Sequence, residues 1–339
     1  MSSTSFSKDI FTPQKSNSTS SIFLKFLFSF IILTGIIFYV ATPISAEENS
    51  ADEIILSVSS SPSSLPAFYV QEHSENINLK TTVHRSRNIV ISRLMKNEVD
   101  AALLSTNEAA KLYNRGVDVK IAGIHTWGIF YLLSSRDEVQ GWNDLKGKTI
   151  YIPDRGGPLD IIFQELLKKN KINIAEDLEV RRGKMMEISQ LMINDMAETA
   201  VLREPFVTQT LLKNNKTKLI LDLQQEWETE YDFRIPQSAL VFRSKFVEEN
   251  PQLVEDLEQE YVNAVNYLEE NQTTAADLGH QFLEFDREVI LNSFERLNLK
   301  YENINQVREE CEMYFQSLMN YSKETIGGRM PDEEFYLEK

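Results

Sequence analysis

The sequence predicts an α/β protein, because short apolar stretches typical of strands alternate with longer amphipathic stretches typical of helices. Its 339 residues are enough for two lobes of ordinary domain size, each with its own core. Hydrophobic residues make up 42% of the chain and charged residues 25%, which is typical of a folded globular protein. These observations predict parallel sheets covered by helices.

The alternation can be followed along the chain from residue 53. Strands are expected at residues 53–59, 101–105 and 118–124, and an extended stretch at 128–135 is expected to end the first lobe. A Ser/Pro corner follows the first strand, and a helix is expected to begin near Thr106. A further strand is expected at 149–152. The apolar residues between Leu159 and Leu167 then recur at helical spacing, which predicts one buried helix face.

The N-terminus is a separate segment. Three lysines precede or enter an apolar run, and small and then acidic residues follow it. This order predicts a secretory signal cleaved after Ala46. The alternative is an uncleaved membrane anchor, because residues 22–40 approach the roughly 20 residues that span a bilayer. In either case the flanking charges place the rest of the chain outside the cytoplasm, in the periplasm or on the outer face of the cell membrane.

Charge and cysteine content argue against several classes of function. Asp and Glu number 51 against 35 Lys and Arg, a net charge of −16, which disfavours a nucleic-acid partner. The single cysteine, Cys311, cannot form an internal disulfide, and with four scattered histidines it gives little support for a metal site. We therefore expect no metal and no cofactor. Spacing alone identifies no catalytic triad and no close carboxylate pair, so an enzyme is the less favoured alternative.

Polar corners follow several of the predicted strands. The corner after residues 149–152 contains Arg155, Gly156, Gly157 and Pro158. A nucleotide-binding loop would need a lysine and a hydroxyl after its last glycine, and neither is present. The corner is therefore either a structural turn or one wall of a ligand cleft. Ligands of open α/β sheets lie outside the carboxyl ends of strands, near helix N-termini, so we expect several such corners to converge on one ligand.

The candidate ligand-binding residues lie at these corners and strand ends: Ser63, Ser64, Ser105, Thr106, Trp127, Arg155, Gly156, Gly157, Arg203 and Glu204. Each has a structural alternative. The hydroxyls also suit helix caps, Trp127 equally suits a buried structural aromatic, and Arg203 equally suits an ion pair with Glu204. His125 is interpreted as a structural histidine.

The nature of the ligand stays open at this point. Arg155 and Arg203 favour an anionic group such as a sulfonate, carboxylate or nitrate, because a guanidinium group binds oxyanions with two hydrogen bonds. Asp154, Asp160 and Glu204 lie in the same segments and would repel an anion or neutralise the arginines. A zwitterion or a neutral heterocycle is the alternative.

Four segments, in their order and spacing, resemble a known family. The stretch GWNDLKGKTIYIPDRGGPLDIIFQELL (141–167) resembles the second-lobe opening of extracytoplasmic solute-binding proteins of the nitrate/sulfonate/taurine (thiamine-precursor-like) type, which feed ABC importers. The stretches VDAALLSTNEAAKLYNRGVDVKIAG (99–123), TAVLREPFVTQTLL (199–212) and ALVFRSKFVEENPQLVEDLEQEYVNAV (239–265) are similar to other segments of that family. Arg203 departs from the pattern, because a proline is common there. The resemblance covers residues 53 to 268.

The resemblance implies a two-lobe fold of the periplasmic-binding-protein-like type II, with a ligand cleft between the lobes. Residues 52–136 plus 242–339 would form lobe 1 and residues 137–241 lobe 2, with crossings near Ser134–Glu138 and Ala239–Arg243. A monomer is expected to bind a small solute, close about the hinge and deliver the solute to the permease and ATPase components of an ABC importer.

Two alternatives remain for this fold. One is a membrane-anchored ligand sensor, which an uncleaved segment at 22–40 would favour. The other is an enzyme on the same fold. Pyrimidine-precursor synthases that resemble it depend on a cysteine cluster that this chain lacks, and the related menaquinone-pathway enzymes are cytoplasmic.

Overall fold

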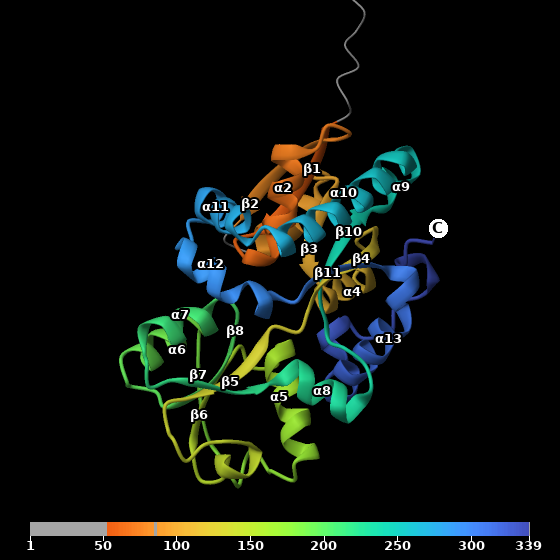
Figure 1. The fold of residues 1–339 in the computed structure, drawn as a ribbon. Coiled ribbons are helices and arrows are strands. Elements are labelled where there is room, and N and C mark those ends of the chain that lie inside the picture. Colours follow the sequence, from red (N-terminus) through yellow and green to blue (C-terminus); the bar gives the residue numbers. More distant parts are fainter. Residues whose placement is uncertain (1–52, 85–86, 339) are drawn as a thin grey trace, which may run out of the picture. The chain divides into compact units, whose positions relative to one another are not determined.

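The computed structural model describes residues 53–84 and 87–338 (Figure 1). The predicted signal peptide or anchor at 1–46 lies outside the described residues. Among the helices of the described residues, none is both long enough and apolar enough to cross a membrane.

The first sheet has six strands in the order β11-β4-β10-β3-β1-β2. Strand β1 pairs in parallel with β2 and β3, whereas β10 is antiparallel to β3 and β4, and β11 is antiparallel to β4. The strands are β1 (Glu53–Ser59), β2 (Asn78–His84), β3 (Ala101–Ser105), β4 (Val119–Trp127), β10 (Pro236–Arg243) and β11 (Leu299–Asn303).

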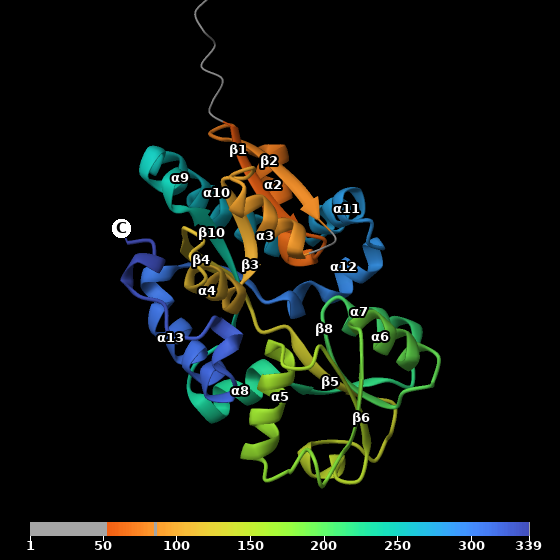
Figure 2. The ribbon, with the colours of Figure 1, turned by 180° about the vertical axis from the view of Figure 1, so that it is seen from behind.

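Helices cover both faces of this sheet. Helices α2 and α10 lie on one face (Figure 1), and α3 and α4 lie on the other, as the view from behind shows (Figure 2). The remaining helices of this lobe come from the C-terminal part of the chain. The helices are α2 (Leu65–His73), α3 (Arg87–Met95), α4 (Thr106–Asn114), α9 (Ser244–Glu249), α10 (Pro251–Glu270), α11 (Gln272–Leu283), α12 (Arg287–Ser293) and α13 (Ile304–Tyr321).

The second sheet has five strands in the order β7-β6-β8-β5-β9. Strand β6 is parallel to β7 and β8, and β5 is antiparallel to β8 and β9. The strands are β5 (Phe130–Ser134), β6 (Thr149–Pro153), β7 (Glu179–Gly183), β8 (Thr199–Arg203) and β9 (Lys218–Asp222). The helices of this lobe are α5 (Pro158–Lys169), α6 (Met185–Ile193), α7 (Phe206–Lys213) and α8 (Leu223–Tyr231).

The hydrophobic pattern explains the positions of the central elements. Strand β4 is buried at every residue except Lys120, as expected for a strand with neighbours on both sides and helices on both faces. In α5 the predicted apolar face is buried, including Leu159, Phe163 and Leu167. Pro158 occupies the first helical position, where its missing N–H is no loss.

The chain crosses between the sheets earlier than the sequence suggested. Strand β5 already belongs to the second sheet and β10 to the first, so the crossings lie between Trp127 and Phe130 and between Tyr231 and Pro236. The expected crossings are therefore wrong. The range Ser134–Glu138 begins at the last residue of β5, and Ala239–Arg243 lies within β10. The two crossings are hydrogen-bonded to each other, because the Gly128 N–H donates to the Ile235 carbonyl oxygen at 3.0 Å.

Candidate ligand-binding cleft

A cleft of about 590 Å³ is lined by residues of both lobes. The first lobe contributes the ends of β1, β2, β3 and β4 and the start of β10, and the second lobe contributes the end of β8 and the start of α7. Apart from the start of the antiparallel strand β10, these are strand carboxyl ends and a helix start, the region where α/β sheets bind ligands. Helix α12 of the first lobe contacts α7 of the second beside this region (Figures 1 and 2).

Ser63, Ser105 and Arg203 are the candidates from the sequence that line this cleft. The Ser63 hydroxyl donates to the Ser61 hydroxyl oxygen at 3.0 Å, and Ser105 precedes α4 without capping it through its side chain. The structure thus brings together polar side chains that lie after β1 and at the ends of β3 and β8. These residues come from positions far apart in the sequence.

Ser64 and Thr106 are buried beside the cleft and bonded within the first lobe. The Ser64 hydroxyl donates to the Ser59 carbonyl oxygen at 3.0 Å, and the Thr106 hydroxyl donates to the Pro236 carbonyl oxygen at 2.6 Å. Both side chains are 1% exposed. Their hydroxyls hold the backbone of neighbouring strand ends in place and do not line the cleft.

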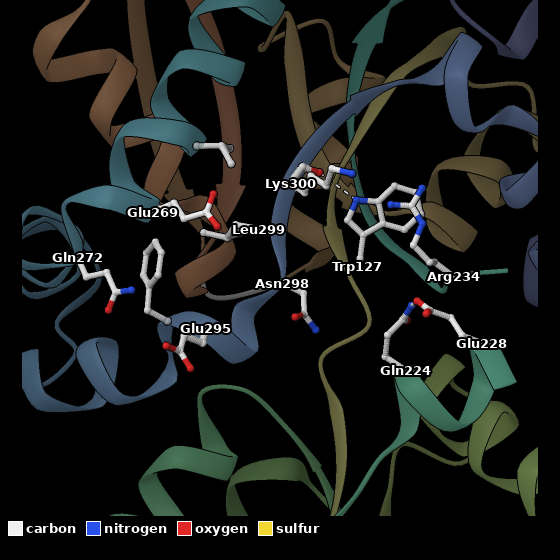
Figure 3. Close-up of a pocket in the computed structure, with 12 residues that line it drawn as sticks. Trp127, Gln224, Glu228, Arg234, Glu269, Gln272, Glu295, Asn298, Leu299 and Lys300 are labelled. Atoms are coloured by element: carbon white, nitrogen blue, oxygen red, sulfur yellow. Dashed lines mark hydrogen bonds between the residues drawn. The ribbon is translucent and has the colours of Figure 1, made fainter.

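Trp127 lies outside the cleft, in the packing around the two crossings. It lines a separate pocket of about 450 Å³ (Figure 3). Its indole N–H donates to the Lys300 carbonyl oxygen at 2.9 Å, and the Arg234 guanidinium lies 3.7 Å from the centre of a ring. Arg234 in turn donates to the carboxylates of Glu302 and Glu310. In this structure Trp127 therefore corresponds to the second interpretation, a buried structural aromatic.

The corner from Arg155 to Pro158 forms a turn held by its own hydrogen bonds. The Gly156 N–H donates to Asp160 Oδ2 at 2.8 Å, and the Gly157 N–H donates to the Asp154 carbonyl oxygen at 2.8 Å. Asp160 is fully buried and also accepts from Arg182 Nη1 at 2.7 Å. Both N–H groups are therefore engaged within the turn, and the corner does not line the cleft, as the structural alternative predicts.

Replacing Gly157 with valine is expected to lower the free energy of unfolding by about 1–3 kcal/mol, the cost of overpacking. A β-carbon at this position would lie only 2.9 Å from the Asp154 carbonyl oxygen, so the turn would have to shift. Urea unfolding measures this loss, and calorimetric titration of the folded molecules measures solute affinity. A tenfold loss of affinity with unchanged stability would instead assign the corner to the ligand site.

Arg203 and Glu204 face different surroundings, although they are adjacent at the end of β8. Arg203 lines the cleft, whereas the Glu204 carboxylate is 0% exposed. Glu204 Oε2 accepts from the Thr208 N–H at 3.1 Å, and Oε1 accepts from the Thr208 hydroxyl at 2.9 Å and from Arg296 Nε at 2.6 Å. Burial raises the pKa of Glu204, and Arg296 opposes that shift. Glu204 therefore connects the two lobes and does not line the cleft.

Several residues that line the cleft were not among the candidates, and two of them are buried polar residues. His125 on β4 and Gln237 on β10 both line the cleft and are 0% and 8% exposed. Burial lowers the pKa of His125 to about 3, so its imidazole is neutral at physiological pH. A histidine near the end of an apolar strand is a usable signal for a ligand site, although it also suits a structural role. Gln237 gave no signal in the sequence.

The described residues give no sign of a metal centre. No group of three or more His, Cys, Asp or Glu side chains among residues 53–84 and 87–338 is arranged to hold a metal ion. Cys311 is buried in α13, and burial raises the pKa of its thiol.

Comparison with known proteins supports the fold. Residues 67–279 match the NMT1-like family. An ABC transporter protein from Parabacteroides distasonis is 23% identical with a TM-score of 0.75, covering 84% of this chain and 99% of that chain. The periplasmic aliphatic sulphonate binding protein of Escherichia coli is 10% identical with a TM-score of 0.68, covering 85% of this chain and 93% of that chain.

The periplasmic nitrate-binding protein of Synechocystis PCC 6803 is 13% identical with a TM-score of 0.59, covering 82% of this chain and 84% of that chain. No curated protein matches the chain. These likenesses confirm the predicted two-lobe α/β fold. Because the matched residues make up more than half of the sequence, the protein belongs to the NMT1-like family.

Proposed function

We propose that this protein captures a small solute outside the cytoplasm and delivers it to the permease and ATPase components of an ABC importer. The observation that carries the proposal is a cleft lined by strand ends of both lobes. The sulphonate-binding and nitrate-binding proteins that share the fold are periplasmic, which supports both a binding role and the location. The predicted signal peptide supports export, and retention of that segment would anchor the protein to the membrane. In either case the protein would act as a monomer.

Binding explains the cleft better than catalysis does. His125 is the buried imidazole in the cleft, and a pKa of about 3 makes it a poor general base near neutral pH. The chain's only thiol, that of Cys311, is buried in α13. The solute would be a sulfonate, nitrate or carboxylate that meets Arg203, or a small heterocycle held by neutral polar groups.

Delivery requires closure of the lobes about the two crossings. The crossings are short and bonded to each other, and the Asn298 side chain also donates to the Gly128 carbonyl oxygen at 2.8 Å. Short paired connections concentrate a change of backbone angles at a few residues, as in other hinge movements. Closure around a solute would present an altered surface to a permease.

Solute binding is expected to reduce the radius of gyration of the mature protein. The solute can be identified by native mass spectrometry of protein purified from its host, then removed by unfolding and refolding. Small-angle scattering of the solute-free and reloaded protein then measures the change, because closure brings the two lobes together. Confirmed binding with an unchanged radius would contradict hinge closure. Failure to retain or rebind any small molecule would contradict the binding function itself.

A further inference from the structure

The pairing of β4 with β10 is irregular where it borders the cleft. Ile124 pairs with Ala239, but Thr126 pairs with Ser238 and Trp127 pairs with Pro236. One residue on each strand is therefore left without an opposite partner: His125 on β4 and Gln237 on β10. Such β-bulges redirect a side chain and are common beside functional sites.

Both of these residues line the cleft, and the side chain of each contains an unsatisfied polar atom. His125 Nε2 and Gln237 Oε1 have no hydrogen-bond partner among the described residues, although the side chains are 0% and 8% exposed. Buried polar atoms without a partner are rare, because their desolvation is not compensated. A solute in the cleft could provide the missing partners.

The hydrogen-bonding chemistry of the two atoms restricts that solute. Gln237 Oε1 is a carbonyl oxygen and can only accept, so its partner must be a donor. His125 Nδ1 lies 3.0 Å from the Thr126 hydroxyl, which can donate or accept. The neutral imidazole can consequently offer either a lone pair or an N–H at Nε2. A nitrate or sulfonate oxygen has no hydrogen to donate to Gln237 Oε1 and would have to accept from the NH2 group of the same side chain instead.

The charged side chains in the described part of the cleft also argue against an anionic solute. Arg203 is the only lysine or arginine among the described lining residues, and Glu108 and Glu284 provide two carboxylates. His84 also lines the cleft, and burial and the nearby Arg93 lower its pKa. These described groups give no excess of positive charge to attract an anion.

We propose that His125 and Gln237 determine specificity, by binding an uncharged edge of the solute that carries a hydrogen-bond donor beside an acceptor, as in a primary amide or a lactam. The inference rests on the proposed function of the cleft as a solute site. It specifies the chemical class of the solute and assigns recognition of that solute to the two residues at the β-bulges.

Matched probes of similar shape test the class of solute. Nicotinamide and nicotinate form one pair, and methanesulfonamide and methanesulfonate form the other; calorimetric titration measures each. The uncharged member is expected to bind at least tenfold more tightly. Tighter binding of the anion, a retained oxyanion in native mass spectrometry, or failure of all four probes to bind would overturn this inference. A retained oxyanion that induces closure would leave the proposed function standing.

Variants test the two residues. Gln237→Met and His125→Leu should each weaken binding of the uncharged probe at least tenfold. The melting temperature of Gln237→Met without solute should stay the same or rise, because the change removes an unsatisfied buried polar atom. His125→Leu also removes the partner of the buried Thr126 hydroxyl, so a lower melting temperature is expected for that variant. Gln190→Met, at an exposed residue of α6, is the matched control and should change neither quantity. A lower melting temperature with unchanged affinity in both variants would show a structural role and overturn the assignment.

Discussion

Replacing Trp127 with alanine is expected to lower the free energy of unfolding by about 3–5 kcal/mol, the range for removing a large buried aromatic side chain. The indole is 3% exposed and lies beside both crossings, so its removal leaves space next to them that the surrounding side chains fill only in part. Its N–H bond to the Lys300 carbonyl oxygen and its contact with Arg234 are lost as well. Affinity for solute should change little, because the side chain lies outside the cleft.

Urea unfolding and calorimetric titration of the same variant separate these two effects. Trp127→Phe is the matched control, since it keeps an aromatic ring but loses the N–H bond, and about 1 kcal/mol is expected for that loss. Near-native stability of the alanine variant together with a large loss of affinity would show that Trp127 contacts the solute after all.

The fold was predictable because its signals are local and strong. Strand β4 and helix α5 are buried along the residues where the sequence places apolar side chains, and the order of strands and helices follows from the alternation of the two patterns. The crossings were not predictable in the same way. The apolar residues of 130–134 would suit a buried strand of the first sheet as well as of the second. Their composition therefore does not indicate which sheet they join.

The site was predictable where a polar residue is the last residue of a regular strand. Ser105 and Arg203 end β3 and β8, and the topology alone brings such ends together. His125 and Trp127 show why the rest could not be predicted. Trp127 is a ligand candidate from its place in the sequence and His125 suits a structural role, whereas in the structure His125 lines the cleft and Trp127 does not. A bulge shifts the phase of a strand, and a one-residue shift exchanges its two faces.

Replacing Arg296 with methionine is expected to lower the free energy of unfolding by about 3 kcal/mol at pH 7, the lower end of the range for breaking a buried ion pair. The Glu204 carboxylate is 0% exposed, while Arg296 is 28% exposed and donates to both Glu204 Oε1 and the Thr208 hydroxyl. Methionine keeps much of the aliphatic stem but leaves the buried carboxylate without its positive partner. The Thr208 bonds alone would then have to compensate for its desolvation.

The loss of unfolding free energy in Arg296→Met should grow as the pH rises from 4 to 7. Burial already raises the folded-state pKa of Glu204, and removing Arg296 removes a group that lowers it. A carboxyl group whose pKa is higher in the folded state contributes its full stabilisation of the fold below its unfolded pKa of about 4.3. That stabilisation is lost as the pH rises through the folded-state pKa. The variant should therefore approach wild-type stability near pH 4 and fall furthest behind it at neutral pH.

Urea unfolding at several pH values, repeated with Glu204→Gln and with the double variant, isolates the pair. In the double variant no charge is buried, so its pH dependence should match that of Glu204→Gln alone, and it should be more stable at pH 7 than Arg296→Met. An equal loss for Arg296→Met at pH 4 and pH 7 would mean that packing of the arginine stem, and not the buried charge, joins α7 to the segment after α12. The pair would then have no electrostatic role in holding the lobes together.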